Sequence, residues 1–269
     1  MADKKRLNLE DKRNIRSLYQ LLGNNAISFN SYEGYIVELQ LISCNLSAYP
    51  SIVNNFTKLE ILDLSRNEIN YIPESIRRLK FLESFHLDKN LLETLPKYIT
   101  EIPTLKKLNL ANNNISLMPQ SIKNLRNLIP LSLSYNKLEV LPKTITNLSS
   151  LEVLYIDNNG LISLPKNIGL LKNLRELSLS SNHLKSLPDS IGNLENLRFL
   201  SLVNNYLEKL PKSLGNLRSL RFLWLDKNKL RKLPESVLKI SSLEKLQLRD
   251  NPLEYNPDFL KDKSFHIVF

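Results

Sequence analysis

The sequence predicts an α/β solenoid, in which a parallel β-sheet forms the concave face and extended segments with short helical turns form the convex face. Three observations predict this class. Apolar residues recur every 23 positions, an asparagine follows most of them at a fixed distance, and a proline follows each asparagine-type position. A unit this short cannot close a core alone, so a fixed period of this length is typical of stacked repeats.

The period begins at Ile36 and continues through ten units without a gap. The first residue of each unit is apolar: Ile36, Leu59, Leu82, Leu105, Leu128, Leu151, Leu174, Leu197, Leu220 and Leu243. Eight residues later the units carry Cys44, Asn67, Asn90, Asn113, Asn136, Asn159, Asn182, Asn205, Asn228 and Asn251. A proline stands fourteen residues after each start, from Pro50 to Pro257, so the period places ten of the 13 prolines.

The unit reads LxxLxLxxNxLxxLPxxIxxLxx, as in residues 174–196. This pattern resembles the leucine-rich repeat family in its 23-residue LPxxI variety, which occurs in Ras-associated scaffold proteins and in many bacterial repeat proteins. The resemblance covers residues 36–258. It implies a horseshoe-shaped solenoid used for protein–protein recognition, and it implies a structural role for Cys44, since this family also accepts cysteine at the asparagine position.

Physical chemistry assigns a structure to each part of the unit. The LxL segment alternates inward and outward as a short strand does, and identical stacked strands give a parallel sheet. The asparagine side chain offers two donors and one acceptor, so we expect it to satisfy backbone groups where the chain turns inward. The proline fixes φ and removes a donor, so we expect the return side to be extended or to form short helical turns.

Residues 1–35 precede the period, and we expect them to form an N-terminal helical cap. The segment from Asn8 to Gly23 carries the signals of one helix. Asn8 is a candidate N-cap, acidic residues occupy the first turn, and Gly23 stands just past the end. A cap here would cover the first repeat of the 36–258 array, whose open end otherwise exposes a strand edge.

Residues 259–269 are expected to form a C-terminal cap or closing strand. Asn256 and Lys263 interrupt the apolar pattern there, while the final residues are strand-like in composition. Two alternatives are an edge strand and the start of an eleventh unit. A free strand edge can pair with a second molecule, so a homodimer through this end is also possible.

The solvent-facing positions of the predicted sheet place large apolar side chains together in the C-terminal half. These candidate partner-binding residues are Tyr135, Val153, Tyr155, Phe199, Val203, Phe222 and Trp224. Phe199 and Phe222 occupy the same position on neighbouring strands, within stacking reach. Aromatic side chains exposed on a rigid sheet are typical of protein interfaces, although the same rings could simply shield the sheet. We therefore expect a non-enzymatic module that binds a protein partner.

The net charge of +10 raises the question of nucleic acid. The solvent-facing sheet positions carry seven acidic residues (Glu38, Asp63, Asp88, Asp157, Glu176, Asp226, Asp250) and six basic ones (Arg66, Lys89, Lys107, Lys227, Lys245, Arg249). The positive excess therefore lies elsewhere, most densely at Arg77, Arg78 and Lys80. Because a nucleic-acid groove combines clustered positive charge with stacking aromatics, we expect no nucleic-acid partner.

An alternative function uses the same protein-binding mechanism in another biological setting. The chain would then be a secreted bacterial effector or adhesin that recognises a host surface protein. The sequence leaves the compartment open. No apolar run approaches the ~18 residues of a transmembrane helix, so we expect no membrane insertion. The single cysteine cannot form an intramolecular disulfide.

Ser84, His86 and Asp88 share one predicted strand and face. Residues two apart on a strand are separated by about 6.5 Å, so we expect a poor hydrogen-bonded relay and assign no catalytic residue. Asp63, with His86 and Asp88, is only a weak candidate for an adventitious metal, and we expect no cofactor and no dedicated metal site.

Overall fold

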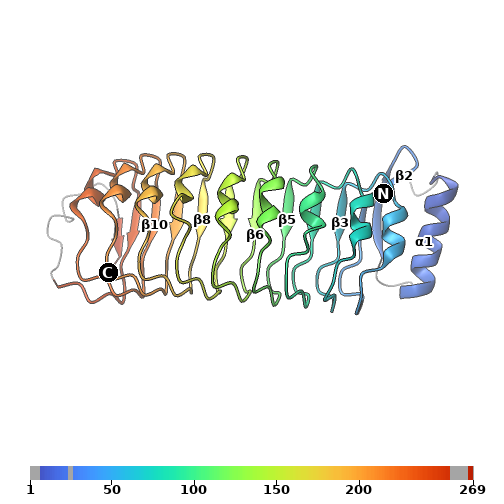
Figure 1. The fold of residues 1–269 in the computed structure, drawn as a ribbon, viewed down its shortest axis with the longest axis horizontal. Coiled ribbons are helices and arrows are strands. Elements are labelled where there is room, and N and C mark those ends of the chain that lie inside the picture. Colours follow the sequence, from blue (N-terminus) through green and yellow to red (C-terminus); the bar gives the residue numbers. More distant parts are fainter. Residues whose placement is uncertain (1–6, 24–26, 255–265, 269) are drawn as a thin grey trace.

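The predicted solenoid is confirmed by the computed structural model, which describes residues 7–23, 27–254 and 266–268. The repeats follow one another along the long axis of the molecule, with α1 at one end (Figure 1). Within these described residues, twelve strands form one sheet, and their order in the sheet is their order in the sequence. The fold is thus a single-file stack in which each repeat contacts its sequence neighbours.

Each repeat contributes one strand to the sheet. These strands are β2 (Tyr35–Gln40), β3 (Ile61–Asp63), β4 (Ser84–His86), β5 (Lys107–Asn109), β6 (Pro130–Ser132), β7 (Val153–Tyr155), β8 (Glu176–Ser178), β9 (Phe199–Ser201), β10 (Phe222–Trp224) and β11 (Lys245–Gln247). Neighbouring strands are parallel and shifted by one repeat, so that Leu200 lies opposite Leu177 on one side and Leu223 on the other. The solvent side of this sheet is called the sheet face below.

The return side of the repeats carries short 3₁₀ helices, as the prolines predicted. They are η1 (Ser51–Asn55), η2 (Glu74–Arg78), η3 (Ile99–Glu101), η4 (Gln120–Asn124), η5 (Lys143–Asn147), η6 (Ile168–Leu170), η7 (Asp189–Asn193), η8 (Lys212–Asn216) and η9 (Glu235–Lys239). Most of them begin directly after the proline of their repeat, as η7 does after Pro188. Proline is favoured at such a start because the missing N–H has no partner there in any case.

The core lies between the sheet and the 3₁₀ helices and is built from the apolar positions of the period. In one repeat, Leu200, Leu202 and Leu207 are completely buried, and the equivalent residues of the other repeats form the same columns. Full burial of a leucine side chain contributes about 1.5–3 kcal/mol, so the columns supply the main driving force for stacking.

The asparagines join successive repeats, as expected from their hydrogen-bonding capacity. The Asn182 side chain donates to the carbonyls of Ile156 and Leu179 and accepts from the N–H of Leu161. The same three contacts recur at Asn67, Asn90, Asn113, Asn136, Asn159, Asn205, Asn228 and Asn251. Each asparagine therefore satisfies buried backbone groups in its own repeat and in the preceding one.

The first repeat has Cys44 at the asparagine-type position. The Cys44 N–H donates to the Asn67 side chain over 2.9 Å, so the asparagine of the second repeat links the first two repeats. Burial raises the pKa of the Cys44 thiol, and this disfavours the thiolate that a nucleophile or metal ligand requires.

The residue directly before each asparagine-type residue has a left-handed backbone. Its φ lies between 52° and 58° at all ten of these positions, from Ser43 to Asp250, and none of these residues is glycine. This conformation disfavours most side chains, so the turn imposes a small, repeated strain that the surrounding hydrogen bonds hold in place.

The N-terminal region contains the helix α1 (Leu9–Leu22), and Asn8 is its N-cap, as predicted. The Asn8 side chain accepts from the Asp11 N–H at 2.9 Å, and Gly23 follows the helix with φ of 73°. Asp11 in turn accepts from the N–H of Ile36 at 2.7 Å. The helix is therefore tied to the first repeat by a buried hydrogen bond as well as by apolar packing through Leu18, which is completely buried.

An antiparallel hairpin connects α1 to the repeats, and the sequence analysis did not anticipate it. Its strands are β1 (Ser28–Tyr32) and β2, and its turn residues Glu33 and Gly34 have φ of 48° and 83°. Two consecutive positive φ values are typical of the tight turns that match the twist of a hairpin. Consequently the sheet begins with one antiparallel strand.

At the other end, β12 (His266–Val268) pairs in parallel with β11. Asn256, Pro257 and Lys263 lie outside the described residues. The division of the chain into a cap, ten repeats and a closing segment, and homodimerisation through the C-terminal end, stay predictions.

Candidate protein-binding site

A hollow of about 700 Å³ opens on the sheet face over β7, β8, β9 and β10. Because side chains alternate along a strand, residues two apart, such as Phe222 and Trp224, both face this side. The hollow is lined by Glu152, Val153, Tyr155, Arg175, Glu176, Arg198, Phe199, Arg221, Phe222 and Trp224. We call it the aromatic hollow. It contains five of the seven predicted partner-binding residues, and all five are partly buried.

Two of the aromatic rings that line the hollow contact each other. Phe199 and Trp224 meet edge to face, with ring centroids 4.6 Å apart and planes at 89°. This pair is diagonal across neighbouring strands, whereas the sequence pointed to Phe199 and Phe222 in one column. An edge-to-face pair contributes about 0.5–1.5 kcal/mol beyond its buried area, so the two rings support each other.

The indole nitrogen of Trp224 is buried, and it has no hydrogen-bond partner among the described residues. A buried donor without an acceptor costs about 1–3 kcal/mol, and a buried tryptophan usually finds a partner for this group. Among the described residues, the indole ring is therefore held without a hydrogen bond from its nitrogen.

Tyr155 is fixed at one side of the hollow by Glu176. The tyrosine hydroxyl donates to the Glu176 carboxylate on the neighbouring strand. Burial and then this hydrogen bond to a negative group raise the pKa of Tyr155 to about 12. The hydroxyl is consequently protonated at neutral pH, and it already engages part of the Glu176 charge.

The rim of the hollow carries a charged column from five successive repeats: Glu152, Arg175, Arg198, Arg221 and Glu244. The outer arginines pair outward. Arg175 lies 3.4 Å from Glu152, and Arg221 makes two hydrogen bonds to Glu244 at 2.6 and 3.0 Å. Within the part of the chain that the structure describes, the exposed middle arginine, Arg198, has no ion-pair partner.

The remaining predicted residues, Tyr135 and Val203, do not line the hollow. Tyr135 is 55% exposed and occupies a left-handed turn position, while Val203 is partly buried and lies two residues after the end of β9. The arginine column is not among the predicted binding residues. Its signal in the sequence is an arginine one residue after the start of each of three successive units.

The Ser84–His86 pair corrects one expectation. The Ser84 hydroxyl lies 3.0 Å from His86 Nε2, although residues two apart on a strand were expected to be too distant. The strand spacing separates the backbones, but the serine and imidazole bend toward each other across it. A relay is still incomplete, because Asp88 accepts from Asn109 at 2.8 Å instead. Burial, with the nearby Asp63 carboxylate, raises the Asp88 pKa.

Among the described residues, no three histidine, cysteine, aspartate or glutamate side chains converge as metal ligands. No helix of the described segments has the length and apolar character needed to cross a bilayer. These two findings concern residues 7–23, 27–254 and 266–268 alone.

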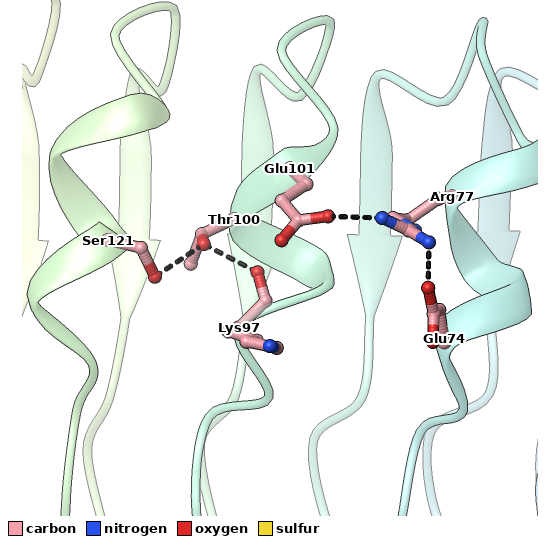
Figure 2. A network of polar contacts seen from close by, with 6 residues as sticks. All are labelled: Glu74, Arg77, Lys97, Thr100, Glu101 and Ser121. Atoms are coloured by element: carbon pink, nitrogen blue, oxygen red, sulfur yellow. Dashed lines mark hydrogen bonds and ion pairs between the residues drawn. The ribbon is translucent and has the colours of Figure 1, made fainter.

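The basic spot predicted at Arg77, Arg78 and Lys80 is partly neutralised. Arg77 bridges Glu74 in its own 3₁₀ helix and Glu101 of η3, the latter at 2.9 Å (Figure 2). Thr100 of η3 lies 2.6 Å from the Lys97 carbonyl and 2.7 Å from the Ser121 hydroxyl of η4. The return side is therefore joined by polar contacts between repeats, and its cationic groups are not all available to an anionic polymer.

Comparison with known families decides the classification. A model of the leucine-rich repeat region matches residues 97–188 and 165–262, and a leucine-rich repeat model matches residues 58–79. The chain belongs to the leucine-rich repeat family. Domains of this family are generally protein-interaction scaffolds and are usually non-catalytic. No curated protein sequence matches the chain.

Solved structures of the leucine-rich repeat family share the fold. A leucine-rich repeat protein of Leptospira interrogans is 25% identical, with a TM-score of 0.56 over 84% of this chain and 82% of that one. The ectodomain of an Arabidopsis thaliana membrane receptor kinase, solved in complex with Casparian strip integrity factor 2, is 31% identical with a TM-score of 0.74. The match covers 82% of this chain and 28% of the receptor chain.

A Listeria monocytogenes internalin is also similar, at 17% identity and a TM-score of 0.65, over 91% of this chain and 82% of that one. At this identity the likeness concerns the fold alone. The three structures come from bacterial and plant proteins, so the solenoid itself does not indicate one biological setting.

Proposed function

We propose that this leucine-rich repeat solenoid is a non-enzymatic interaction module that docks a protein partner on its sheet face, with the aromatic hollow at the centre of the interface. The observation that carries the proposal is the convergence of Tyr155, Phe199, Phe222 and Trp224 around one hollow. Tryptophan, tyrosine and arginine dominate the few residues that supply most of the binding energy of protein interfaces, and here all three types meet.

The alternative is that the rings merely shield the sheet. One feature favours binding over shielding. The aromatic side chains leave a hollow of about 700 Å³ instead of closing over it. Rings that serve only as a cover need no such hollow, whereas a rigid, partly buried pocket is what an anchoring side chain of a partner requires.

The rigidity of the stack also supports this function. Each strand beneath the hollow is held by its asparagine contacts and by buried leucines, so the ring positions are set before a partner arrives. A preformed surface reduces the ordering cost of association. The plant receptor ectodomain was solved in complex with Casparian strip integrity factor 2, which is consistent with recognition by a solenoid of this kind. A bacterial effector or adhesin would use the same surface, and that biological setting stays a prediction.

Affinity capture with matched variants tests the proposal. The wild-type chain and the Phe222→Ala, Trp224→Ala double variant are used as baits for lysates and cell-surface fractions. We expect the double variant to lose the captured partner while its circular dichroism stays that of the wild type. Its melting temperature should fall by only a few degrees, because both rings are partly buried and loss of the Phe199–Trp224 contact costs about 0.5–1.5 kcal/mol. Capture that survives this double substitution contradicts the proposal.

A control variant removes two aromatic side chains from outside the hollow. Tyr71 and Phe81 are 57% and 46% exposed and do not line the hollow, so Tyr71→Ala with Phe81→Ala removes a comparable apolar surface. We expect this control to capture the partner as the wild type does. Equal loss in both double variants would indicate a general effect of removing exposed aromatic side chains and would refute a specific role for the hollow.

A further inference from the structure

We infer that the partner segment bound in the aromatic hollow carries a carboxylate that pairs with Arg198, directly beside the apolar side chain that enters the hollow. This inference rests on the proposed function and adds the chemistry of the partner. It concerns an internal acidic residue, aspartate or glutamate, in an extended polypeptide.

The charge pattern of the rim carries the inference. Five successive repeats place two glutamates outside and three arginines inside one column. Each outer arginine pairs with the glutamate next to it, Arg175 with Glu152 and Arg221 with Glu244. The middle arginine therefore has a cationic neighbour on each side and no anion of its own among the described residues. An incoming carboxylate at Arg198 would give each of the three arginines one anionic partner.

The number of charges favours a single negative charge. The residues lining the hollow comprise three arginines and two glutamates, which gives a net charge of +1. Glu152 and Glu176 both line the hollow, so a doubly charged phosphate would meet repulsion that one carboxylate largely avoids. Arginine also binds a carboxylate through two parallel hydrogen bonds, which fixes orientation as well as adding energy.

The position of Arg198 sets the arrangement of the partner. Arg198 directly precedes Phe199, whose ring contacts Trp224 on the floor of the hollow. The cationic and apolar contacts are thus adjacent, and successive residues of an extended segment are only about 3.3 Å apart. An aspartate or glutamate one or two residues from a large apolar residue can reach both contacts at once.

A selection from displayed random linear peptides, followed by affinity measurements on synthetic peptides, tests this inference. We expect the selected peptides to combine an acidic residue with a neighbouring large apolar residue. Loss of one charge-assisted contact in Arg198→Ala should weaken such peptides by about tenfold. Arg198→Glu should shift the selection to basic residues. Arg126→Ala, an exposed arginine outside the hollow, is the matched control and should bind as wild type.

The outcomes separate this inference from the proposed function. If Phe222→Ala abolishes peptide binding but Arg198→Ala leaves it unchanged, the hollow is a docking site and the carboxylate assignment is wrong. If both variants bind the selected peptides like the wild type, both proposals fail. Tighter binding after the acidic residue is replaced by phosphoserine would assign the site to phosphate and overturn the inference.

Discussion

The Asn182 side-chain amide donates to the carbonyl of Ile156 in the preceding repeat over 2.9 Å, and Asn182 is only 2% exposed. This contact crosses the boundary between two repeats at a point that water cannot reach. It shows that the asparagine column acts between repeats as well as within each turn, because the same side chain also contacts Leu179 of its own repeat.

Asn182→Ala should be strongly destabilising. The substitution leaves the Leu161 N–H and the Ile156 and Leu179 carbonyls without this partner, and each unsatisfied buried group costs about 1–3 kcal/mol. We expect a loss of about 2–4 kcal/mol in the free energy of unfolding, measured by urea denaturation. Asn196→Ala is the control, since Asn196 makes one exposed contact to Lys172, and it should cost less than about 1 kcal/mol. Similar losses in both would contradict the larger cost expected for the buried contacts of Asn182.

Gly192→Ala should loosen the contact between η7 and η8. A Cβ at this position would lie 2.2 Å from the Ser213 carbonyl oxygen, so the helices must separate. Overpacking of this kind costs about 1–3 kcal/mol. At Gly160, by contrast, the nearest atom to an added Cβ is 3.5 Å away, and Gly160→Ala should be neutral or stabilise by about 0.4–1 kcal/mol. Thermal melting of both variants measures the difference, and equal melting temperatures would show that η7 and η8 can adjust freely.

Asn112→Val should reveal the strain in the turn before each asparagine. Asn112 is exposed with φ of 55°, so its replacement removes little packing but places a β-branched residue in a left-handed conformation. We expect a cost of about 1–2 kcal/mol in chemical denaturation. Asn112→Gly, which tolerates this φ, should remain within about 1 kcal/mol of wild type. A valine variant as stable as the glycine variant would mean that the turn relaxes to another conformation.

Glu176→Gln should lower the pKa of Tyr155 from about 12 while leaving it above the ordinary value of 10, because burial, the larger cause, remains. Ultraviolet phenolate absorbance measures this titration, with Tyr155→Phe subtracted to remove the other tyrosines. The folded state holds this proton more tightly than the unfolded chain does. The resulting contribution to stability is therefore complete below pH 10 and is lost as the pH rises through about 12. An unchanged pKa in the glutamine variant would contradict the hydrogen bond to Glu176.

The repeats were predictable because their spacing is a physical requirement. Each unit must present the same strand, asparagine and proline to its neighbour, so the position of Asn182 or Leu200 follows from the period alone. Five residues of the aromatic hollow were predictable for the same reason, because strand alternation decides which side chains face water.

Features outside the period were not predictable in this way. The β1–β2 hairpin depends on a two-residue turn at Glu33 and Gly34, a local signal that the repeat pattern does not contain. The ion pairs of Arg175 and Arg221, and the contact of Ser84 with His86, depend on side-chain torsions that spacing does not determine. The same torsions leave Arg198 without an ion-pair partner among the described residues.

The direction of β1 makes the two edges of the sheet different. Every repeat strand runs the same way, but β1 at the N-terminal edge runs opposite to them. A second copy placed end to end would bring β12 beside a reversed strand, so any strand pairing across the junction would be antiparallel. The hairpin thus gives an end-to-end contact a hydrogen-bond pattern different from that of the interior, and the parallel ladder cannot continue from one copy into the next.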